Sequence, residues 1–298
     1  MSGQTLLTLV VGAVFLFLGG CTSIEKRPSA KEYYTQANEL YSKEDFTSAV
    51  DTYRDLLDHY PLNPYAEEAQ LKIAYSYYIE KKYAEAIASF NDFERAYPIS
   101  MHLPFVEYYR GMCYLEQMRS IDRDQSVTEK AHDHFRAVTD RFPESSFAPL
   151  AEKKIKVCRD AMAANELMVA RFYDRYNNVL AAKARLRALI ENYPETEAAI
   201  GALEQLEILL VEEDNQNLAK IAAQALSIRK AEKSTQEKPS EDANSLPAPG
   251  VDPLLTLVTE LKKQEDEVRQ RAQGTMSVQV KKMTENADNI RENPEDEE

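Results

Sequence analysis

The sequence predicts an all-α fold made of stacked helix pairs, and two observations support that prediction. Glycine is rare, at 8 of 298 residues, while Ala, Glu, Lys, Leu and Tyr are plentiful, which is typical of helical proteins. A pattern of small residue, aromatic residue and proline also recurs along the chain at a constant spacing. Such internal repetition indicates one supersecondary unit that is stacked several times.

The repeat consists of an Ala, an aromatic residue or Leu four positions later, and a Pro twelve positions later. Its four copies are Ala49/Tyr53/Pro61, Ala86/Phe90/Pro98, Ala131/Phe135/Pro143 and Ala182/Leu186/Pro194. Twelve positions before the Ala stands a second small residue in three copies, namely Ala37, Ala74 and Ala170. In the third copy Gly111 takes this role, and eight residues are inserted. Small residues let two antiparallel helices cross closely, and proline ends the second helix because it disfavours helix in the residue before it.

The order and spacing of these residues resemble the tetratricopeptide repeat. Residues 203–230 look like a fifth, degenerate pair that lacks the proline. The longer gap after Pro143 predicts a long helix from about Leu150 to Arg171. We therefore expect a right-handed solenoid of about five helix pairs over residues 31–230.

The N-terminus carries an apolar run, residues 5–18, which is shorter than the ~20 residues that a membrane-spanning helix needs and suits a secretory signal. The sequence Leu18-Gly19-Gly20-Cys21 resembles a bacterial lipobox, which implies that residues 1–20 are removed and that Cys21 carries covalent lipid such as palmitate. The alternative is a short signal anchor with an incidental Cys. No Lys or Arg precedes the run, so a translation start upstream of Met1 stays open. Because Thr22 follows the Cys where Asp commonly retains lipoproteins in the inner membrane, the resemblance implies an anchor in the outer membrane that faces the periplasm.

The segments that flank the repeats differ in composition. Residues 21–30 are expected to form a tether. Residues 231–251 are polar and contain three prolines, which predicts a linker. Residues 252–273 begin with Asp-Pro and carry leucines at helical spacing, so we expect an amphipathic helix that folds onto the solenoid or onto a partner. Residues 274–298 are acidic and are expected to be disordered.

An aromatic stripe is predicted on the first helix of the first three pairs, which lines the concave surface in tetratricopeptide folds. We call these nine residues the predicted groove: Tyr34, Asn38, Tyr41, Leu71, Tyr75, Tyr78, Phe105, Tyr108 and Met112. Tyrosine offers a large contact area at small entropic cost, so such a groove suits an extended peptide. The alternative is that these rings only pack between helix pairs. Exposure distinguishes the two, because a groove leaves several rings partly open.

A narrower resemblance appears in the second pair. The stretch Tyr60-Pro61-Leu62-Asn63-Pro64-Tyr65, which continues through Gln70-Leu71 to Tyr75-Ser76-Tyr77-Tyr78, resembles the BamD family of outer-membrane lipoproteins. Tyr109-Arg110-Gly111 and the insertion around Asp122-Arg123-Asp124 resemble it too, and the likeness covers about residues 18–230.

This resemblance implies a non-enzymatic scaffold of the outer-membrane β-barrel assembly (BAM) complex. It implies docking through the C-terminal repeats on the last POTRA domain of BamA, other BAM lipoproteins as neighbours, and unfolded outer-membrane proteins as clients of the N-terminal repeats. By position, Arg185 is implied to pair with an acidic residue of BamA, whereas without the family it would be an ordinary solvated Arg. A second hypothesis is a tetratricopeptide lipoprotein that scaffolds cell-wall or division proteins.

Other chemistry finds little support in the sequence. The net charge of −14 disfavours nucleic acid as a partner, and clustered glycines for a nucleotide phosphate are missing. His132 and His134 point to different faces of a helix, which disfavours a metal pair. We therefore expect neither a metal nor a cofactor besides the lipid, and no enzymatic activity. Cys113 and Cys158 are either a disulfide or two buried small residues.

Overall fold

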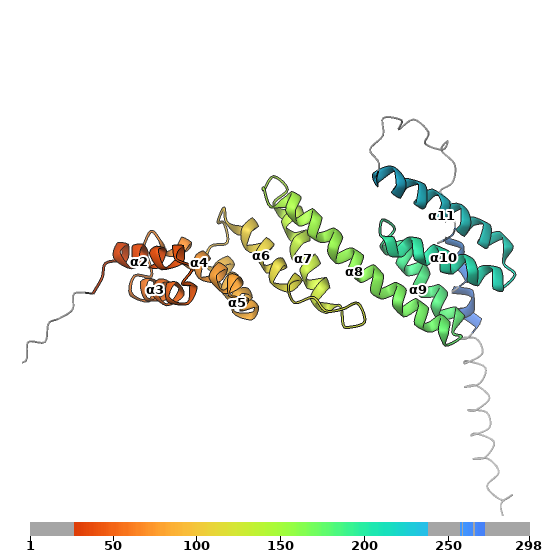
Figure 1. The fold of residues 1–298 in the computed structure, drawn as a ribbon, viewed down its shortest axis with the longest axis horizontal. Helices are drawn as coiled ribbons and strands as arrows, with labels where there is room; N and C mark the ends of the chain where they lie inside the picture. Colours follow the sequence, from red (N-terminus) through yellow and green to blue (C-terminus); the bar gives the residue numbers. More distant parts are fainter. Residues whose placement is uncertain (1–26, 238–256, 258, 265, 272–298) are drawn as a thin grey trace, which may run out of the picture. The chain divides into compact units, whose positions relative to one another are not determined.

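The computed structural model describes residues 27–237, 257, 259–264 and 266–271, and all regular elements within these ranges are helices (Figure 1). The predicted signal sequence, Cys21, and the acidic residues after 271 lie outside the described residues. None of the described helices is both long enough and apolar enough to cross a membrane.

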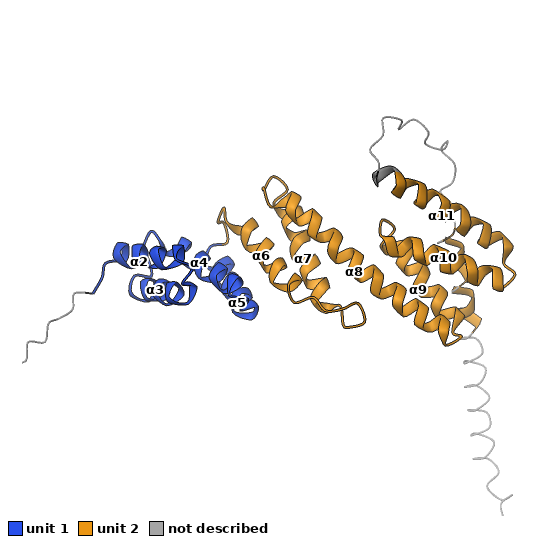
Figure 2. Ribbon diagram, in the orientation of Figure 1, with its two compact units in different colours: residues 1–97 blue, residues 98–298 orange. Residues whose placement is uncertain are grey.

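The helices divide between two compact units, Met1–Tyr97 and Pro98–Glu298 (Figure 2). Unit 1 contains α2 (Ala30–Ser42), α3 (Phe46–His59), α4 (Ala66–Ile79) and α5 (Tyr83–Ala96). Unit 2 contains α6 (Leu103–Leu115), α7 (Ser126–Arg141), α8 (Ala148–Arg175), α9 (Val179–Asn192), α10 (Glu197–Glu212) and α11 (Gln216–Glu237).

Within each unit, every helix packs chiefly on its neighbours in the chain, as tetratricopeptide-like pairs do. Unit 1 holds the pairs α2–α3 and α4–α5, and unit 2 holds α6–α7, α8–α9 and α10–α11. The fifth pair predicted for residues 203–230 is therefore present. The predicted long helix is also confirmed: α8 spans Ala148–Arg175, and it contacts α7, α9 and α10.

The small residues of the repeat lie at the crossings of the paired helices. The alanines of the repeat are all fully buried: Ala37, Ala49, Ala74, Ala86, Ala131, Ala170 and Ala182. The aromatic residue or Leu of each copy is likewise inaccessible to solvent, namely Tyr53, Phe90, Phe135 and Leu186. In the third pair, the ring of Phe135 lies directly over Gly111, where an added Cβ would come within 2.8 Å of the ring. The repeat is thus a packing motif.

The prolines end the second helix of a pair as predicted. The C-caps of α3, α5, α7 and α9 are Tyr60, Tyr97, Phe142 and Tyr193, each of which precedes a Pro. All four leave the helical region in the same way, with φ from −136° to −129°. Their N–H groups still donate to the carbonyl four residues back at 2.8–2.9 Å, so the backbone stays satisfied at each exit.

The turns inside four of the pairs share a left-handed residue. Glu44, Lys81, Asn177 and Asp214 have φ from 58° to 62°, in the same place between the two helices of a pair. Asn and Asp tolerate this conformation, whereas Glu and Lys do so at a cost of about 1–2 kcal/mol. The third pair has no such residue, because a longer connection, residues 116–125, which contains the predicted insertion, joins α6 to α7 instead.

The end of α11 differs from the predicted boundary at residue 230. The helix continues to Glu237, so the first part of the predicted linker is helical. Helix-forming residues continue up to Pro239, and ion pairs hold the added turns: Arg229 with Glu232 at 2.8 Å, and Lys233 with Glu197 of α10.

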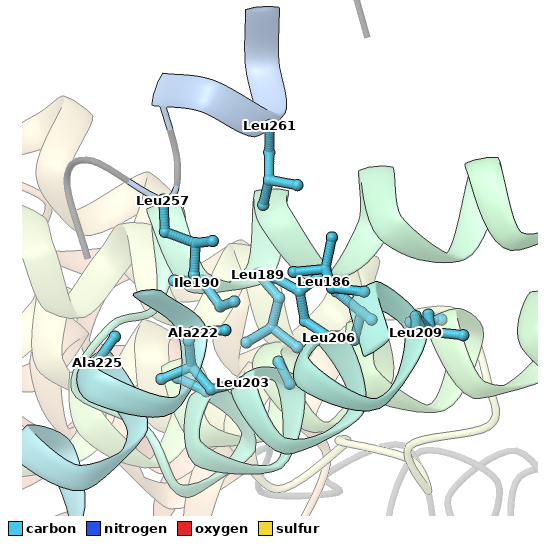
Figure 3. Packing of buried hydrophobic residues seen from close by; sticks show 14 of the residues in the cluster. Leu186, Leu189, Ile190, Leu203, Leu206, Leu209, Ala222, Ala225, Leu257 and Leu261 are labelled. Atoms are coloured by element: carbon cyan, nitrogen blue, oxygen red, sulfur yellow. The ribbon is translucent and has the colours of Figure 1, made fainter. Parts of the chain in front are cut away.

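A helical segment after the linker packs on unit 2. Leu257 and Leu261 are buried, at 0% and 3% exposure, in the cluster formed by α8 to α11. Figure 3 shows Leu257 beside Ile190, and Leu261 pointing toward the leucines of α9. Each buried Leu contributes about 1.5–3 kcal/mol, so these two contacts favour packing of the segment on α8 to α11.

The close crossing at Gly111 makes a first prediction. Gly111→Ala should lower the free energy of unfolding by about 1–3 kcal/mol, because the new Cβ overlaps the buried ring of Phe135. Gly201→Ala is the matched control on α10: its Cβ would meet the ends of two side chains, Leu167 at 3.0 Å and Arg171 at 3.6 Å, and alanine favours the helix. Urea denaturation should show a loss for the first variant and at most a small change for the second. Equal losses of stability in the two variants would contradict a close helix crossing at Gly111.

The packing of the segment after the linker makes a second prediction. Leu257→Asp should release residues 257–271, because a carboxylate cannot replace a fully buried Leu without loss of its hydration. Hydrogen–deuterium exchange of these residues should then rise to the level of an unfolded chain. Val268→Asp is the control, since Val268 is 41% exposed on the same segment, and it should leave the protection at Leu257 and Leu261 intact.

Candidate functional site

A cluster of tyrosines lies on the first helices of the two pairs in unit 1. The tyrosine cluster consists of Tyr34 and Tyr41 of α2, Tyr75 and Tyr78 of α4, and Tyr65, which precedes α4. Tyr34 stacks on Tyr65 with ring centroids 4.3 Å apart and planes 11° from parallel. Tyr75 stacks on Tyr78 at 5.9 Å. Tyr34 of α2 thus contacts Tyr65 beside α4, a residue outside the predicted groove, and Tyr75 contacts Tyr78 within α4.

Lys72 links the two helices of the tyrosine cluster. Its ammonium nitrogen lies 5.6 Å from the ring centroid of Tyr34 and 5.5 Å from that of Tyr41, within cation–π range. It also donates to Asn38 Oδ1 at 2.6 Å and pairs with Glu68 at 2.8 Å. Lys72 is not among the predicted groove residues. Its position directly after Leu71, which belongs to the predicted stripe, was the one sign in the sequence that it lies near the rings.

Asn38 serves the core as well as the surface. Its Oδ1 accepts a hydrogen bond from the hydroxyl of Tyr53, which is fully buried, at 2.6 Å, in addition to the one from Lys72. The tyrosine cluster is thereby tied to the crossing of α2 and α3. A polar network of this kind holds surface rings in fixed positions at small cost.

The exposure of the rings favours a binding surface over simple packing. All six predicted groove residues of unit 1 are partly exposed: Tyr34, Asn38, Tyr41, Leu71, Tyr75 and Tyr78. Partial burial raises the pKa of the Tyr34 and Tyr41 hydroxyls above 10.0, and a hydrogen bond with Glu68 adds to the effect at Tyr34. These hydroxyls therefore stay protonated at physiological pH and offer neutral donors and acceptors beside the apolar rings.

The three predicted groove residues of unit 2 behave differently. Phe105 and Met112 on α6 are partly exposed, but Tyr108 is a core residue, so its assignment to the groove was wrong. Its ring lies 5.5 Å from Phe135 and 5.4 Å from Phe147. Helix α8 packs against α6 and α7 and covers this side of α6. The spacing of residues along one helix could not reveal this burial.

A buried carboxylate organises the third pair. Glu107 on α6 is only 4% exposed, and it accepts from Arg110 at 3.0 Å, from Arg141 at 2.7 Å and contacts His134 Nδ1 at 2.8 Å. A carboxylate so far from water needs partners of this kind. His134 is therefore part of a structural network, and Arg110 and Gly111 both serve the packing of α6 on α7.

Arg185 lies on the surface of α9, with 47% of its side chain exposed. Its guanidinium pairs with Glu166 of α8 at 3.1 Å. An exposed ion pair is worth about 0–1 kcal/mol, so an acidic group of a partner can replace Glu166 at little cost. This exposed position is compatible with the pairing to an acidic residue of BamA that the resemblance implies. Glu166 would compete with that residue for the guanidinium of Arg185.

The two cysteines are separate buried thiols. Burial raises the pKa of Cys113 to about 12 and that of Cys158 to about 11, so both remain protonated and unreactive. Within the described ranges, the His, Cys, Asp and Glu residues form no group of three or more that could hold a metal ion.

Comparison with known proteins identifies the family to which the chain is similar. The profile of the family described as YfiO, outer membrane lipoprotein, matches residues 26–226. The chain belongs to this family. It is 30% identical to "Outer membrane protein assembly factor BamD" of Xylella fastidiosa (strain Temecula1 / ATCC 700964) over 235 residues, which cover 74% of the chain and 80% of that protein.

A second relative with the same description, from Caulobacter vibrioides, is 30% identical over 212 residues, which cover 68% of the chain and 69% of that protein. Among solved structures, a tetratricopeptide repeat protein from Parabacteroides merdae ATCC 43184 is 14% identical with a TM-score of 0.33, over 80% of the chain and 87% of that protein. The YfiO match ends within α11, so Leu257 and Leu261 lie beyond it.

The stretch by which the chain resembles the BamD family has a clear structural role. Asn63 donates from Nδ2 to the carbonyl of Tyr60 at 2.5 Å and accepts from the N–H of Tyr65 at 2.7 Å. These two bonds shape the turn between the pairs of unit 1 and set the ring of Tyr65 against Tyr34. In this member of the YfiO family, the turn thus builds one edge of the tyrosine cluster.

The link between Asn38 and the core makes a third prediction. Asn38→Ala should destabilise unit 1 by about 1–3 kcal/mol, because the buried hydroxyl of Tyr53 loses its acceptor. The double variant Asn38→Ala/Tyr53→Phe should recover part of that loss, since neither group is then left unsatisfied. Thermal unfolding measures both, with Gln36→Ala, an exposed amide of the same helix, as the control. If Asn38→Ala and Gln36→Ala change the melting temperature equally, the hydrogen bond from Tyr53 to Asn38 does not contribute to stability.

Proposed function

We propose that this chain is a non-enzymatic, lipid-anchored assembly factor for outer-membrane proteins, and a scaffold of the BAM complex. The observation that carries this proposal is membership of the YfiO family across residues 26–226, together with curated relatives that are described as outer membrane protein assembly factors. The match extends over both compact units, from the start of α2 into α11.

The anchor in this proposal is Cys21. Lipid on its thiol and on the new N-terminus would hold the chain at the periplasmic face of the outer membrane, because each buried methylene contributes about 0.8 kcal/mol and several acyl chains act together. Family membership and the Leu18-Gly19-Gly20-Cys21 sequence support this localisation.

The client surface in this proposal is the tyrosine cluster. Unfolded outer-membrane proteins present extended segments with alternating apolar and polar side chains, as β-strands of a barrel require. Partly exposed rings bind the apolar side chains, while neutral hydroxyls and Lys72 meet polar groups. The fixed positions of the rings lower the entropic cost of binding.

The partner surface in this proposal surrounds Arg185, which would pair with an acidic residue of the last POTRA domain of BamA. Other BAM lipoproteins would bind elsewhere on the chain. The planar guanidinium suits bidentate pairing with a carboxylate, and the weak internal pair with Glu166 leaves it available.

This docking is tested by co-purification with BamA from detergent-solubilised membranes. Arg185→Glu should reduce the BamA recovered by roughly tenfold, because it places two carboxylates against each other. Glu166→Gln should keep BamA binding or strengthen it, since it removes the internal competitor. Arg136→Glu is the control: Arg136 is another exposed arginine of unit 2, with 60% of its side chain accessible, and it is paired with Asp140.

Full BamA binding by Arg185→Glu would remove Arg185 from the interface. The wider proposal has its own test, which is depletion of the chain in cells: the amount of folded β-barrel protein in the outer membrane should fall. Recovery of peptidoglycan enzymes or division proteins in place of BamA would favour the second hypothesis instead.

A further inference from the structure

Unit 2 has a hollow beside its last helix pair. A groove of about 1310 Å³ runs between α8, α10 and the C-terminal part of α11. None of the predicted groove residues lines it, nor does Arg185. We call it the C-terminal groove.

The floor of the C-terminal groove is apolar. It is built from small and aliphatic side chains of α8 and α10: Ala164, Leu167, Met168, Ala198, Ile200 and Gly201. Phe172 on α8 stands at its edge with 52% of its surface exposed, which is unusual for such a large apolar ring. Ile121 of the insertion also lines the groove, and its carbonyl accepts a hydrogen bond from Asn165 at 2.5 Å.

The charges on the two walls differ. On the wall formed by α10 and α11, the basic residues are neutralised within the chain, since Lys230 pairs with Glu204 at 2.8 Å and Lys233 pairs with Glu197. On the α8 wall, Arg171 and Arg175 lie one helical turn apart and flank Phe172. Both are exposed, and within the described part of the chain no ion pair engages either of them.

An apolar floor beside two uncompensated guanidinium groups is complementary to a segment that carries both apolar and acidic side chains. These two arginines differ from the rest of the chain, which has a net charge of −14 and would repel an acidic ligand elsewhere. Two arginines one turn apart can each bind a carboxylate while the apolar side chains between those carboxylates pack on Phe172 and Leu167.

We propose that the C-terminal groove is a second docking site, which binds an acidic, apolar polypeptide segment of a partner protein. Apolar side chains of that segment lie on the floor against Phe172, and its carboxylates pair with Arg171 and Arg175. The site is separate from the tyrosine cluster, which lies in unit 1, and it does not depend on the assembly function proposed above.

The binding test uses a fluorescein-labelled twelve-residue peptide in which Leu and Glu alternate around a central Phe, and the full chain. Its Kd, measured by fluorescence anisotropy, should rise roughly tenfold or more for Arg171→Glu/Arg175→Glu and severalfold for Phe172→Ala. Binding should also weaken as salt is raised. The matched peptide with Lys in place of Glu should bind at least about tenfold more weakly. Arg136→Glu, on α7 outside the groove, should leave the Kd unchanged, and circular dichroism checks that each variant is folded.

Three results would overturn the proposal. The first is that the Glu peptide does not bind, or that the groove variants bind it as well as the unaltered chain does. The second is equal binding of the Lys peptide, which would show that charge plays no part. The third comes from a photo-crosslinking residue at position 172: a covalent dimer, or an internal product with the chain's own C-terminal residues, would assign the groove to a second copy or to the tail.

Discussion

The close crossing of the two helices in each pair is the constraint on which the rest of the structure depends. Helix axes can approach only where a small residue faces the neighbouring helix, and Ala37, Ala74, Gly111 and Ala170 supply that residue in four of the five pairs. A large side chain of the second helix then fills the space beside the crossing, as the ring of Phe135 does over Gly111. Because the side chains at the crossing are wholly buried, each pair is rigid, and its outward faces hold surface residues in fixed positions.

Both proposed binding surfaces depend on these fixed positions, and both are built largely from the first helices of the pairs. In unit 1, α2 and α4 bring the tyrosine cluster together, and Lys72 and Asn38 connect it to the buried Tyr53. In unit 2, α8 and α10 form the floor of the C-terminal groove. The chemistry of the two differs: neutral hydroxyls and rings in one, an aliphatic floor with free arginines in the other. The two proposed surfaces therefore suit partners of different chemistry.

The residues that carry the resemblance to the BamD family have structural roles. Asn63 forms the turn that sets Tyr65 against Tyr34, Arg110 pairs with the buried Glu107, and Gly111 admits Phe135. The inserted loop contributes Ile121 to the C-terminal groove. These roles are structural rather than catalytic, in agreement with a family of assembly factors. The segment around Leu257, beyond the family match, adds apolar contacts to the last pairs.

The sequence by itself determined the helix pairs, their order and the ends of the four helices that precede a Pro. These depend on local rules: small residues at a fixed spacing, and a Pro that forces the residue before it out of the helix. Tyr60, Tyr97, Phe142 and Tyr193 end their helices where those rules require. Contacts between helices that are distant in the chain do not follow from such rules. Tyr108 shares the stripe of Phe105 but is covered by neighbouring helices, and Lys72 enters the tyrosine cluster through contacts across two helices. Only the tertiary structure could decide these, since burial and charge pairing depend on residues that are far apart in the chain, as Arg185 with Glu166 and Lys230 with Glu204 also show.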